Sequence, residues 1–296
     1  MQTANRTRDT LAPTQAVNRL PPHAYFLVSA VFHYLGPSFA VLLFVRLSPV
    51  SVAWLRIATA GVVFAAWRQP WRAFLTLPRR DQAIVVGLGA VLAAMNTIFY
   101  EAIAVLPLAT VGAIEFLGPI AVAAWGLRTQ RNLAALALAS AGAFVLTDLR
   151  IEGALLGFVF AFGNCLLFVF YIVLGHRISA GGAGVSGIDR LGAAMLVASV
   201  AALPFGFQGA LPAFSDPWLL AAGFGVGISS SVIPYVCDQL AMARLPRASF
   251  ALMLSLLPAS ATVIGLLVLR QVPTAGDLAG IGLIMGGVAL HRAERG

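Results

Sequence analysis

Long apolar runs separated by short polar turns make up most of this chain. Each run is about as long as the ~20 helical residues that cross a hydrocarbon core of ~30 Å. The runs predict ten helices, at 24–46, 50–67, 82–105, 108–126, 131–147, 153–176, 188–207, 217–241, 247–269 and 275–291. Such spans are expected to be helical, because unpaired backbone groups are too costly in lipid and the runs lack the alternation of a β-barrel strand. The expected fold is an all-α polytopic membrane protein with ten transmembrane helices.

The composition agrees with lipid as the main solvent. Of the 296 residues, 60% are hydrophobic and only 10% are charged, whereas a soluble domain carries about 25% charged residues. The net charge of +8 does not indicate a nucleic-acid partner, because the arginines stand singly or in pairs at the ends of apolar runs. Residues 1–22 are polar and do not have the pattern of a cleaved signal peptide. We expect a cytoplasmic tail there.

The arginines also orient the bundle. Cytoplasmic loops of membrane proteins carry an excess of positive charge. With the N-terminus inside, the inner segments hold most of the arginines, and the outer segments hold only Arg46, Arg150 and Arg270. An odd number of spans would break this alternation. The sequence therefore predicts that both termini are cytoplasmic.

An internal repeat divides the predicted spans into two halves. Residues 104–131 align without a gap with residues 243–270, at an offset of 139 positions. The matches include Pro107 with Pro246, Pro119 with Pro258, and Gly126 with Gly265. The fourth span then matches the ninth, so the halves are residues 23–150 and 151–292, followed by a short tail at 293–296. Because each half has an odd number of spans, the second enters the membrane from the opposite side, as in the inverted repeats of many secondary transporters.

Two of the matched prolines lie inside predicted helices. Pro119 and Pro258 each remove a backbone hydrogen bond and favour a kink. Either proline alone can form a static kink. A kinked pair related by pseudo-symmetry can instead rock to open one side of the membrane or the other, so we assign both prolines a gating role.

At these residues the chain resembles a known family. The segments Met95-Asn96-Thr97-Ile98-Phe99-Tyr100 and Glu115-Phe116-Leu117-Gly118-Pro119 look like those of the threonine/homoserine exporters, in the EamA branch of the drug/metabolite transporter superfamily. The second half agrees at Pro234-Tyr235 and at Ser255-Leu256-Leu257-Pro258-Ala259. The resemblance covers essentially the whole ten-span body. It implies a transporter of the bacterial inner membrane that exports amino acids or related metabolites through a central cavity.

Ionisable side chains inside a bilayer are costly and usually face a cavity or a partner. Glu115 is expected about 12 Å below the outer end of its helix. As an anion it can hold a substrate ammonium, and when protonated it can carry a proton; the alternative is a static pair with Arg56. Arg56 itself can bind a substrate carboxylate in a forked geometry or extend to the outer interface. Trp54 is expected at the cavity wall or as an interfacial anchor.

Three polar stripes have helical spacing and predict cavity-lining faces. They are Asn96 with Tyr100; Ser231 with Tyr235 and Asp238; and Asn164 with Phe168 and Tyr171. Interhelical hydrogen bonding is the alternative for each stripe, and Asp238 can also pair with Arg244. In the first span, His33 is either a packed hydrogen-bonding residue or a proton relay. The predicted substrate-binding residues are His33, Tyr34, Trp54, Arg56, Asn96, Tyr100, Glu115, Asn164, Ser231, Tyr235 and Asp238.

An intramembrane enzyme is the main alternative from another class. The four histidines are scattered, and neither a HExxH pattern nor a GxxxxGK[ST] loop occurs. We therefore expect a transporter rather than an enzyme, with no metal or cofactor and driven by an ion or substrate gradient. Its expected partners are amino acids, membrane lipid and protons. Within transport, a multidrug or nucleotide-sugar transporter of the same fold is the alternative.

Overall fold

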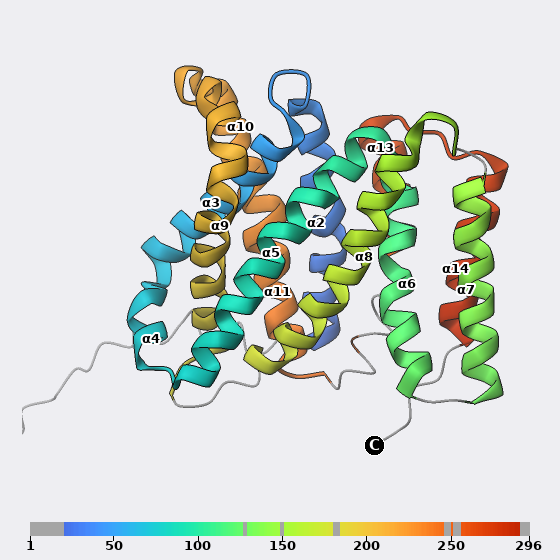
Figure 1. Ribbon diagram of the computed structural model, residues 1–296, viewed down its shortest axis with the longest axis horizontal. Helices are drawn as coiled ribbons and strands as arrows, with labels where there is room; N and C mark the ends of the chain where they lie inside the picture. The colour runs from blue at the N-terminus through green and yellow to red at the C-terminus, as the bar shows by residue number, and fades with distance from the viewer. Residues whose placement is uncertain are drawn as a thin grey trace, which may run out of the picture.

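The computed structural model describes residues 21–126, 129–148, 151–179, 184–245, 250 and 256–290, and within these ranges it contains helices and no strand. The long helices lie side by side along a common direction, and α5 and α8 cross the bundle obliquely (Figure 1). The elements are α2 Pro22–Leu43, α3 Pro49–Arg68, α4 Pro70–Thr76, α5 Arg79–Val105, α6 Leu108–Gly126, α7 Gln130–Asp148, α8 Ile151–Ser179, α9 Gly187–Ser215, α10 Pro217–Gly227, η1 Ile228–Val232, α11 Ile233–Met242, α13 Leu256–Leu269 and α14 Ala275–Leu290.

Six helical segments in the described part of the chain are long and apolar enough to cross a membrane. They are Pro22–Leu43, Pro49–Arg68, Arg79–Val105, Leu155–Ser179, Gly187–Ser215 and Pro217–Met242. Shorter apolar helices run over Leu108–Gly118, Leu257–Leu269 and Ala275–Gly287. The prediction of an all-helical polytopic membrane protein is thereby confirmed. The number of ten spans and the cytoplasmic position of the termini stay predictions.

Local chemistry explains where the helices begin. Ser48 accepts a hydrogen bond from the backbone N–H of Ser51 at the start of α3, and Ser186 accepts one from Asp189 at the start of α9. Asp216 caps α10 by accepting from two backbone N–H groups. Proline stands in the first turn of α3 and α10, where its missing N–H costs no helical hydrogen bond. These residues divide the apolar sequence into separate helices.

The structure differs from the predicted helices in three places. Helix α9 ends at Ser215, eight residues beyond the predicted end at 207. The chain after α3 forms the short helix α4. Hydropathy did not reveal it, because half of its exposed residues are apolar and the helix has no clear separation of apolar and polar faces. The predicted span 217–241 is not one regular helix, because η1 is a π-helical turn between α10 and α11. There the side chains of Ser229 and Ser230 donate to backbone carbonyls of the preceding turn, an interaction that bends helices.

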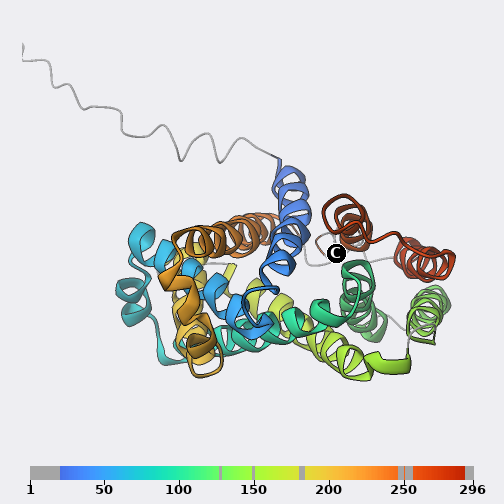
Figure 2. The same cartoon turned by 90° about the horizontal axis from the view of Figure 1, so that it is seen from above.

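If each helix is replaced by its counterpart in the other predicted half, the main contacts between helices map onto contacts that also occur in the structure. α3 packs on α9, α7 on α14, and α6 on α13. The contact of α5 with α8 has its counterpart in α11 with α2, and that of α6 with α8 in α13 with α2. Seen from above, the α7–α14 pair lies at one end of the bundle and the α3–α9 pair at the other (Figure 2). The helices that build the centre are α2, α5, α6, α8 and α11.

Glycine permits the closest approach at this centre. A Cβ atom on Gly36 of α2 would overlap the Cβ of Ser230 in η1 and lie 2.6 Å from its backbone N and Cα. Neither backbone atom can move without shifting the whole turn. Gly36 therefore sets the distance between α2 and η1, and with it the position of the side chains that both elements direct inward.

We predict that Gly36→Ala destabilises the protein, whereas Gly225→Ala does not. The first substitution overpacks the contact of α2 with η1, which typically costs about 1–3 kcal/mol. A Cβ on Gly225 meets no atom within 4 Å, and alanine favours the helix over glycine. Apparent melting temperatures of the two variants in detergent measure the difference. Equal melting temperatures would contradict the role of Gly36.

Candidate functional site

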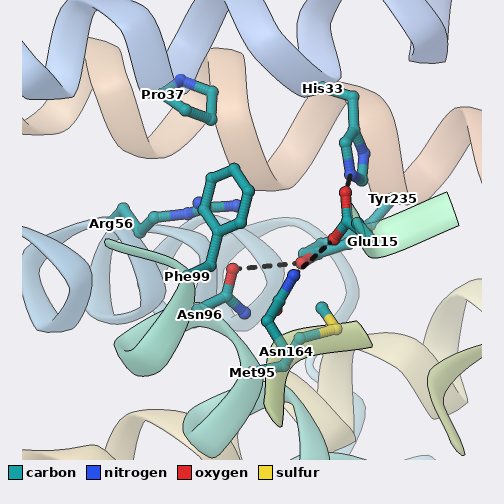
Figure 3. A pocket seen from close by; sticks show the side chains of 9 residues that line it. All are labelled: His33, Pro37, Arg56, Met95, Asn96, Phe99, Glu115, Asn164 and Tyr235. Atoms are coloured by element: carbon teal, nitrogen blue, oxygen red, sulfur yellow. Dashed lines mark hydrogen bonds and ion pairs between the residues drawn. The ribbon is translucent and has the colours of Figure 1, made fainter. Parts of the chain in front are cut away.

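A cavity lies at the centre of the bundle, where α2, α3, α5, α6, α8 and α11 meet (Figure 3). Its free space is close to that of a single water molecule. Its lining residues are His33, Pro37, Arg56, Met95, Asn96, Phe99, Glu115, Asn164 and Tyr235. The polar members of this set were all predicted from the sequence. Each comes from a different helix or face, so the cavity exists only in the assembled bundle.

Glu115 is the carboxylate of this cavity. It stands on α6 and is 2% exposed. Its Oε2 accepts a hydrogen bond from the Tyr34 hydroxyl at 3.1 Å, and its Oε1 accepts one from Asn164 Nδ2 at 2.9 Å. His33 Nε2 lies 3.8 Å from Oε2, an ion pair when the imidazole is protonated. Three predicted residues from α2 and α8 thus surround Glu115, and none of them is Arg56.

Arg56 is the buried cation of the cavity, 4% exposed on α3. Its Nε donates to Ser231 Oγ at 2.9 Å, and its Nη2 donates to the Ser230 carbonyl at 2.7 Å. The guanidinium also lies over the Tyr100 ring, 5.0 Å from its centroid. Arg56 therefore points inward instead of reaching the outer interface, and all of these partners are uncharged.

Pro234 explains why the Ser230 carbonyl is available. In a regular helix this carbonyl would accept from the backbone N–H four residues later, which is Pro234 and has none. A carbonyl left unsatisfied in an apolar interior costs several kcal/mol by general estimates, and Arg56 supplies the missing donor. The Ser230 carbonyl at the helix break and the buried Arg56 guanidinium therefore satisfy each other's need for a hydrogen-bond partner.

Asn96 and Tyr235 link the two predicted halves across the cavity. The Tyr235 hydroxyl donates to Asn96 Oδ1 at 3.1 Å, and the two residues are separated by 139 positions. This separation equals the offset of the internal repeat, so each residue occupies the position of the other in the opposite half. Asn96 Nδ2 donates to the Leu92 carbonyl on its own helix, which orients the amide oxygen towards Tyr235.

Asp238 forms a second buried acidic centre beside the cavity. It is 4% exposed on α11. Its Oδ1 accepts from Ser29 Oγ at 2.5 Å and its Oδ2 accepts from the Tyr171 hydroxyl at 2.8 Å. These partners, and not Arg244, hold the carboxylate; the Arg244 guanidinium lies over the Tyr25 ring.

The other predicted residues fall into two positions. Tyr34, Tyr100 and Ser231 stand behind the cavity wall and contact Glu115 or Arg56. Trp54 is not brought to the cavity, because its Nε1 donates to the Ser199 carbonyl and its ring packs against Phe207 of α9. Sequence reasoning missed Pro37, Met95 and Phe99 as lining residues. Met95 and Phe99 directly precede Asn96 and Tyr100 in the sequence, and this adjacency could have identified them.

The gating prolines remain a prediction. Pro119 falls within the bounds of α6, and its side chain lies outside the described part of the structure. Pro258 is the third residue of α13 as described, and its carbonyl accepts from the Thr262 hydroxyl.

Comparison with known proteins places these features in a family context. The sequence profile of the EamA-like transporter family matches residues 155–292. The chain is 31% identical over 257 residues to the threonine/homoserine exporter RhtA of Escherichia coli strain K12, covering 84% of each protein. The corresponding exporter of Salmonella typhimurium strain SL1344 is 30% identical over 242 residues, covering 81% of this chain and 80% of the relative.

One solved structure resembles the whole fold. A crystal structure of another protein superposes with a TM-score of 0.59 at 18% identity, covering 90% of this chain and 96% of that one. At this identity the likeness concerns the fold alone.

We predict that Tyr235→Phe lowers the free energy of unfolding, whereas Tyr100→Phe leaves it nearly unchanged. The first substitution deprives Asn96 Oδ1 of its donor, a loss of about 0.5–1.5 kcal/mol. Among the described residues, the Tyr100 hydroxyl has no hydrogen-bond partner, so its removal costs little. Unfolding of both variants in detergent tests this. A larger loss for Tyr100→Phe than for Tyr235→Phe would refute the assignment of the hydrogen bond.

Proposed function

The chain belongs to the EamA-like transporter family, and from this premise we propose that it is a secondary transporter that exports amino acids or related small metabolites by alternating access. Family membership makes it a multi-pass membrane exporter of small metabolites. The amino-acid substrate, the bacterial inner membrane as its location, and the mechanism are our proposal.

The observation that carries the substrate proposal is the presence of two opposite buried charges in one cavity. Arg56 and Glu115 both line it, at opposite sides in the view of Figure 3. Their hydrogen-bond partners are hydroxyls, an amide and a backbone carbonyl. Since the two charges do not neutralise each other directly, each can exchange a neutral partner for a charged group of the substrate.

A free amino acid satisfies both charges at once. Its ammonium is the natural partner of the Glu115 carboxylate, and its carboxylate fits the forked donors of the Arg56 guanidinium. Asn96, Asn164 and Tyr235 can hydrogen-bond the remaining polar groups, and Met95, Phe99 and Pro37 offer apolar contact. A lipophilic cationic drug would leave Arg56 unsatisfied, and a nucleotide sugar would leave Glu115 facing an anion. The paired charges therefore favour a zwitterion over the alternative substrates.

Alternating access is supported by the reciprocal packing of the helices. The two halves contact each other through matched pairs of helices, and Asn96 and Tyr235 meet at the offset of the repeat. A residue can touch its own symmetry counterpart only near the axis that relates the halves. We therefore place a pseudo-two-fold axis through the cavity and relate residues 23–150 to 151–292 as inverted five-helix halves, with both termini cytoplasmic.

Transport then requires movement of one half against the other. The free space of the cavity holds little more than a water molecule, so an amino acid can enter only when the halves separate on one side. The matched prolines, Pro119 and Pro258, are our candidates for the flexible points. Glu115 can hold either the substrate ammonium or a proton, but not both, and this competition couples export to proton entry.

We predict that Glu115→Gln abolishes acceleration of transport by a pH gradient. Glutamine keeps the size of the side chain and one of its two acceptor oxygens, but it can neither ionise nor carry a proton. The experiment measures uptake of a panel of radiolabelled amino acids into proteoliposomes, with and without a pH gradient. Glu101→Gln is the matched control, since Glu101 is half-buried on α5 and lies outside the cavity lining. If no amino acid enters above the level of empty liposomes, the substrate proposal is wrong.

We also predict that Arg56→Lys weakens binding of amino acids far more than binding of the corresponding amines. Lysine retains the charge but loses the planar fork that matches a carboxylate, and loss of a charge-assisted hydrogen bond costs about 1.5–3 kcal/mol. This corresponds to roughly a 10- to 100-fold higher KM for the amino acid. Competition of each amino acid and its decarboxylated amine against a labelled substrate measures the contrast. Equal losses for both ligands would remove the carboxylate role from Arg56.

A further inference from the structure

We infer that His33 and Asp238 form the route by which a proton passes between Glu115 and the cytoplasm. The inference rests on the proposed function and adds the residues that connect the cavity to the inner side. Asp238 stands beside the cavity and not in its lining, whereas His33 lines the cavity from α2.

The three groups follow one another along α2. His33 Nε2 lies 3.8 Å from Glu115 Oε2, so a small rotation of the ring brings the two atoms within hydrogen-bond distance. Ser29 stands four residues before His33, hence on the same face of α2 and about 6 Å further along its axis. The Ser29 hydroxyl donates directly to Asp238. His33 is thus one helical turn from the group that donates to Asp238.

These groups lie at successive depths across the membrane. Glu115 is seven residues from the start of α6, about 10 Å along its axis from that end. Asp238 is four residues from the end of α11, about 6 Å from the opposite side of the bundle. In the orientation that the arginines predict, this second side is the cytoplasmic one. The sequence from Glu115 through His33 to Asp238 therefore leads from the cavity inward.

The charges of the cluster balance when it holds one proton. Arg56 contributes one positive charge, and Glu115 and Asp238 contribute two negative charges when both are ionised. Buried unbalanced charge is costly in a membrane protein, so one proton, shared among Glu115, His33 and Asp238, brings the cluster to neutrality. The other titratable groups around it are phenols and thiols, neutral in their ordinary state near pH 7, and Arg244 at the inner end. The phenols and thiols are Tyr34, Tyr100, Tyr171, Tyr235, Cys165 and Cys237.

A substrate ammonium replaces this proton. As the ammonium binds from the cytoplasm, the O–H bond of Glu115 breaks and an N–H bond forms on His33. The imidazolium then gives its proton to the Ser29 oxygen as the Ser29 hydroxyl proton passes to the Asp238 carboxylate, which releases it to inner water. After the substrate leaves to the outside, the Glu115 carboxylate takes up a proton from outer water. One proton enters for each substrate molecule exported, and no electrons are transferred.

The test uses the full chain in proteoliposomes whose interior is one pH unit more acidic than the outside, with the membrane potential clamped at zero. With one proton exchanged per substrate, this gradient supports about tenfold accumulation of a labelled amino acid, because one pH unit corresponds to a factor of ten. We expect about tenfold accumulation for the wild type and close to onefold for His33→Gln and Asp238→Asn. His23→Gln is the matched control, because His23 is exposed at the start of α2, and it should accumulate like the wild type.

The plateau ratio does not depend on how much a substitution slows transport, so it separates coupling from binding. Tenfold accumulation by both His33→Gln and Asp238→Asn would overturn the route and leave the exporter function intact. If the wild type shows saturable uptake but accumulates the amino acid only about onefold, the proton route is also overturned and the exporter function is kept. Absence of amino-acid uptake by the wild type would overturn the proposed function and the route together. If one variant fails to give a monodisperse protein, the other decides, because each interrupts the same path.

Discussion

Buried charge is the interaction on which the rest of this structure depends. Arg56, Glu115 and Asp238 are each at most 4% exposed, inside a bundle whose outer surface is largely apolar. In a medium of low polarity each charge must be met by hydrogen bonds or by an opposite charge. The structure meets them with hydroxyls, an amide and a carbonyl from three elements, α2, α8 and η1. The helices are consequently held in register by the groups that a solute would have to displace.

The irregular parts of the bundle serve the same requirement. Pro234 leaves the Ser230 carbonyl without its helical donor, and Arg56 takes that place. Gly36 allows α2 to approach η1 closely enough for this region to close over the cavity. Non-helical or broken backbone at membrane depth is tolerated where protein or a cavity surrounds it. Here the irregular turn lies beside the buried arginine, which connects the local defect to the candidate site.

Two opposite charges with neutral partners also make the cavity adaptable. A fully paired Arg56 and Glu115 would be a static structural contact, and a substrate would gain little by separating them. Hydroxyls and amides, by contrast, are weaker partners that a zwitterion or a proton can replace. The cavity is therefore suited to the zwitterionic substrate that we propose. The contact between Asn96 and Tyr235 links the two proposed halves across the cavity.

The sequence by itself determined the helices, the family and most polar residues of the cavity. Hydrophobic runs are local, so the bounds of α6 were predicted to the residue, and intramembrane charges such as Glu115 are rare enough to be conspicuous. Only the tertiary structure decided which groups meet. Arg56 donates to a carbonyl that another helix leaves free. Asp238 accepts hydrogen bonds from side chains on α2 and α8. Trp54 contacts α9, and Met95, Phe99 and Pro37 line the cavity. The rotation and depth of each helix select these contacts, and they are properties of the packed bundle that no local stretch of sequence encodes.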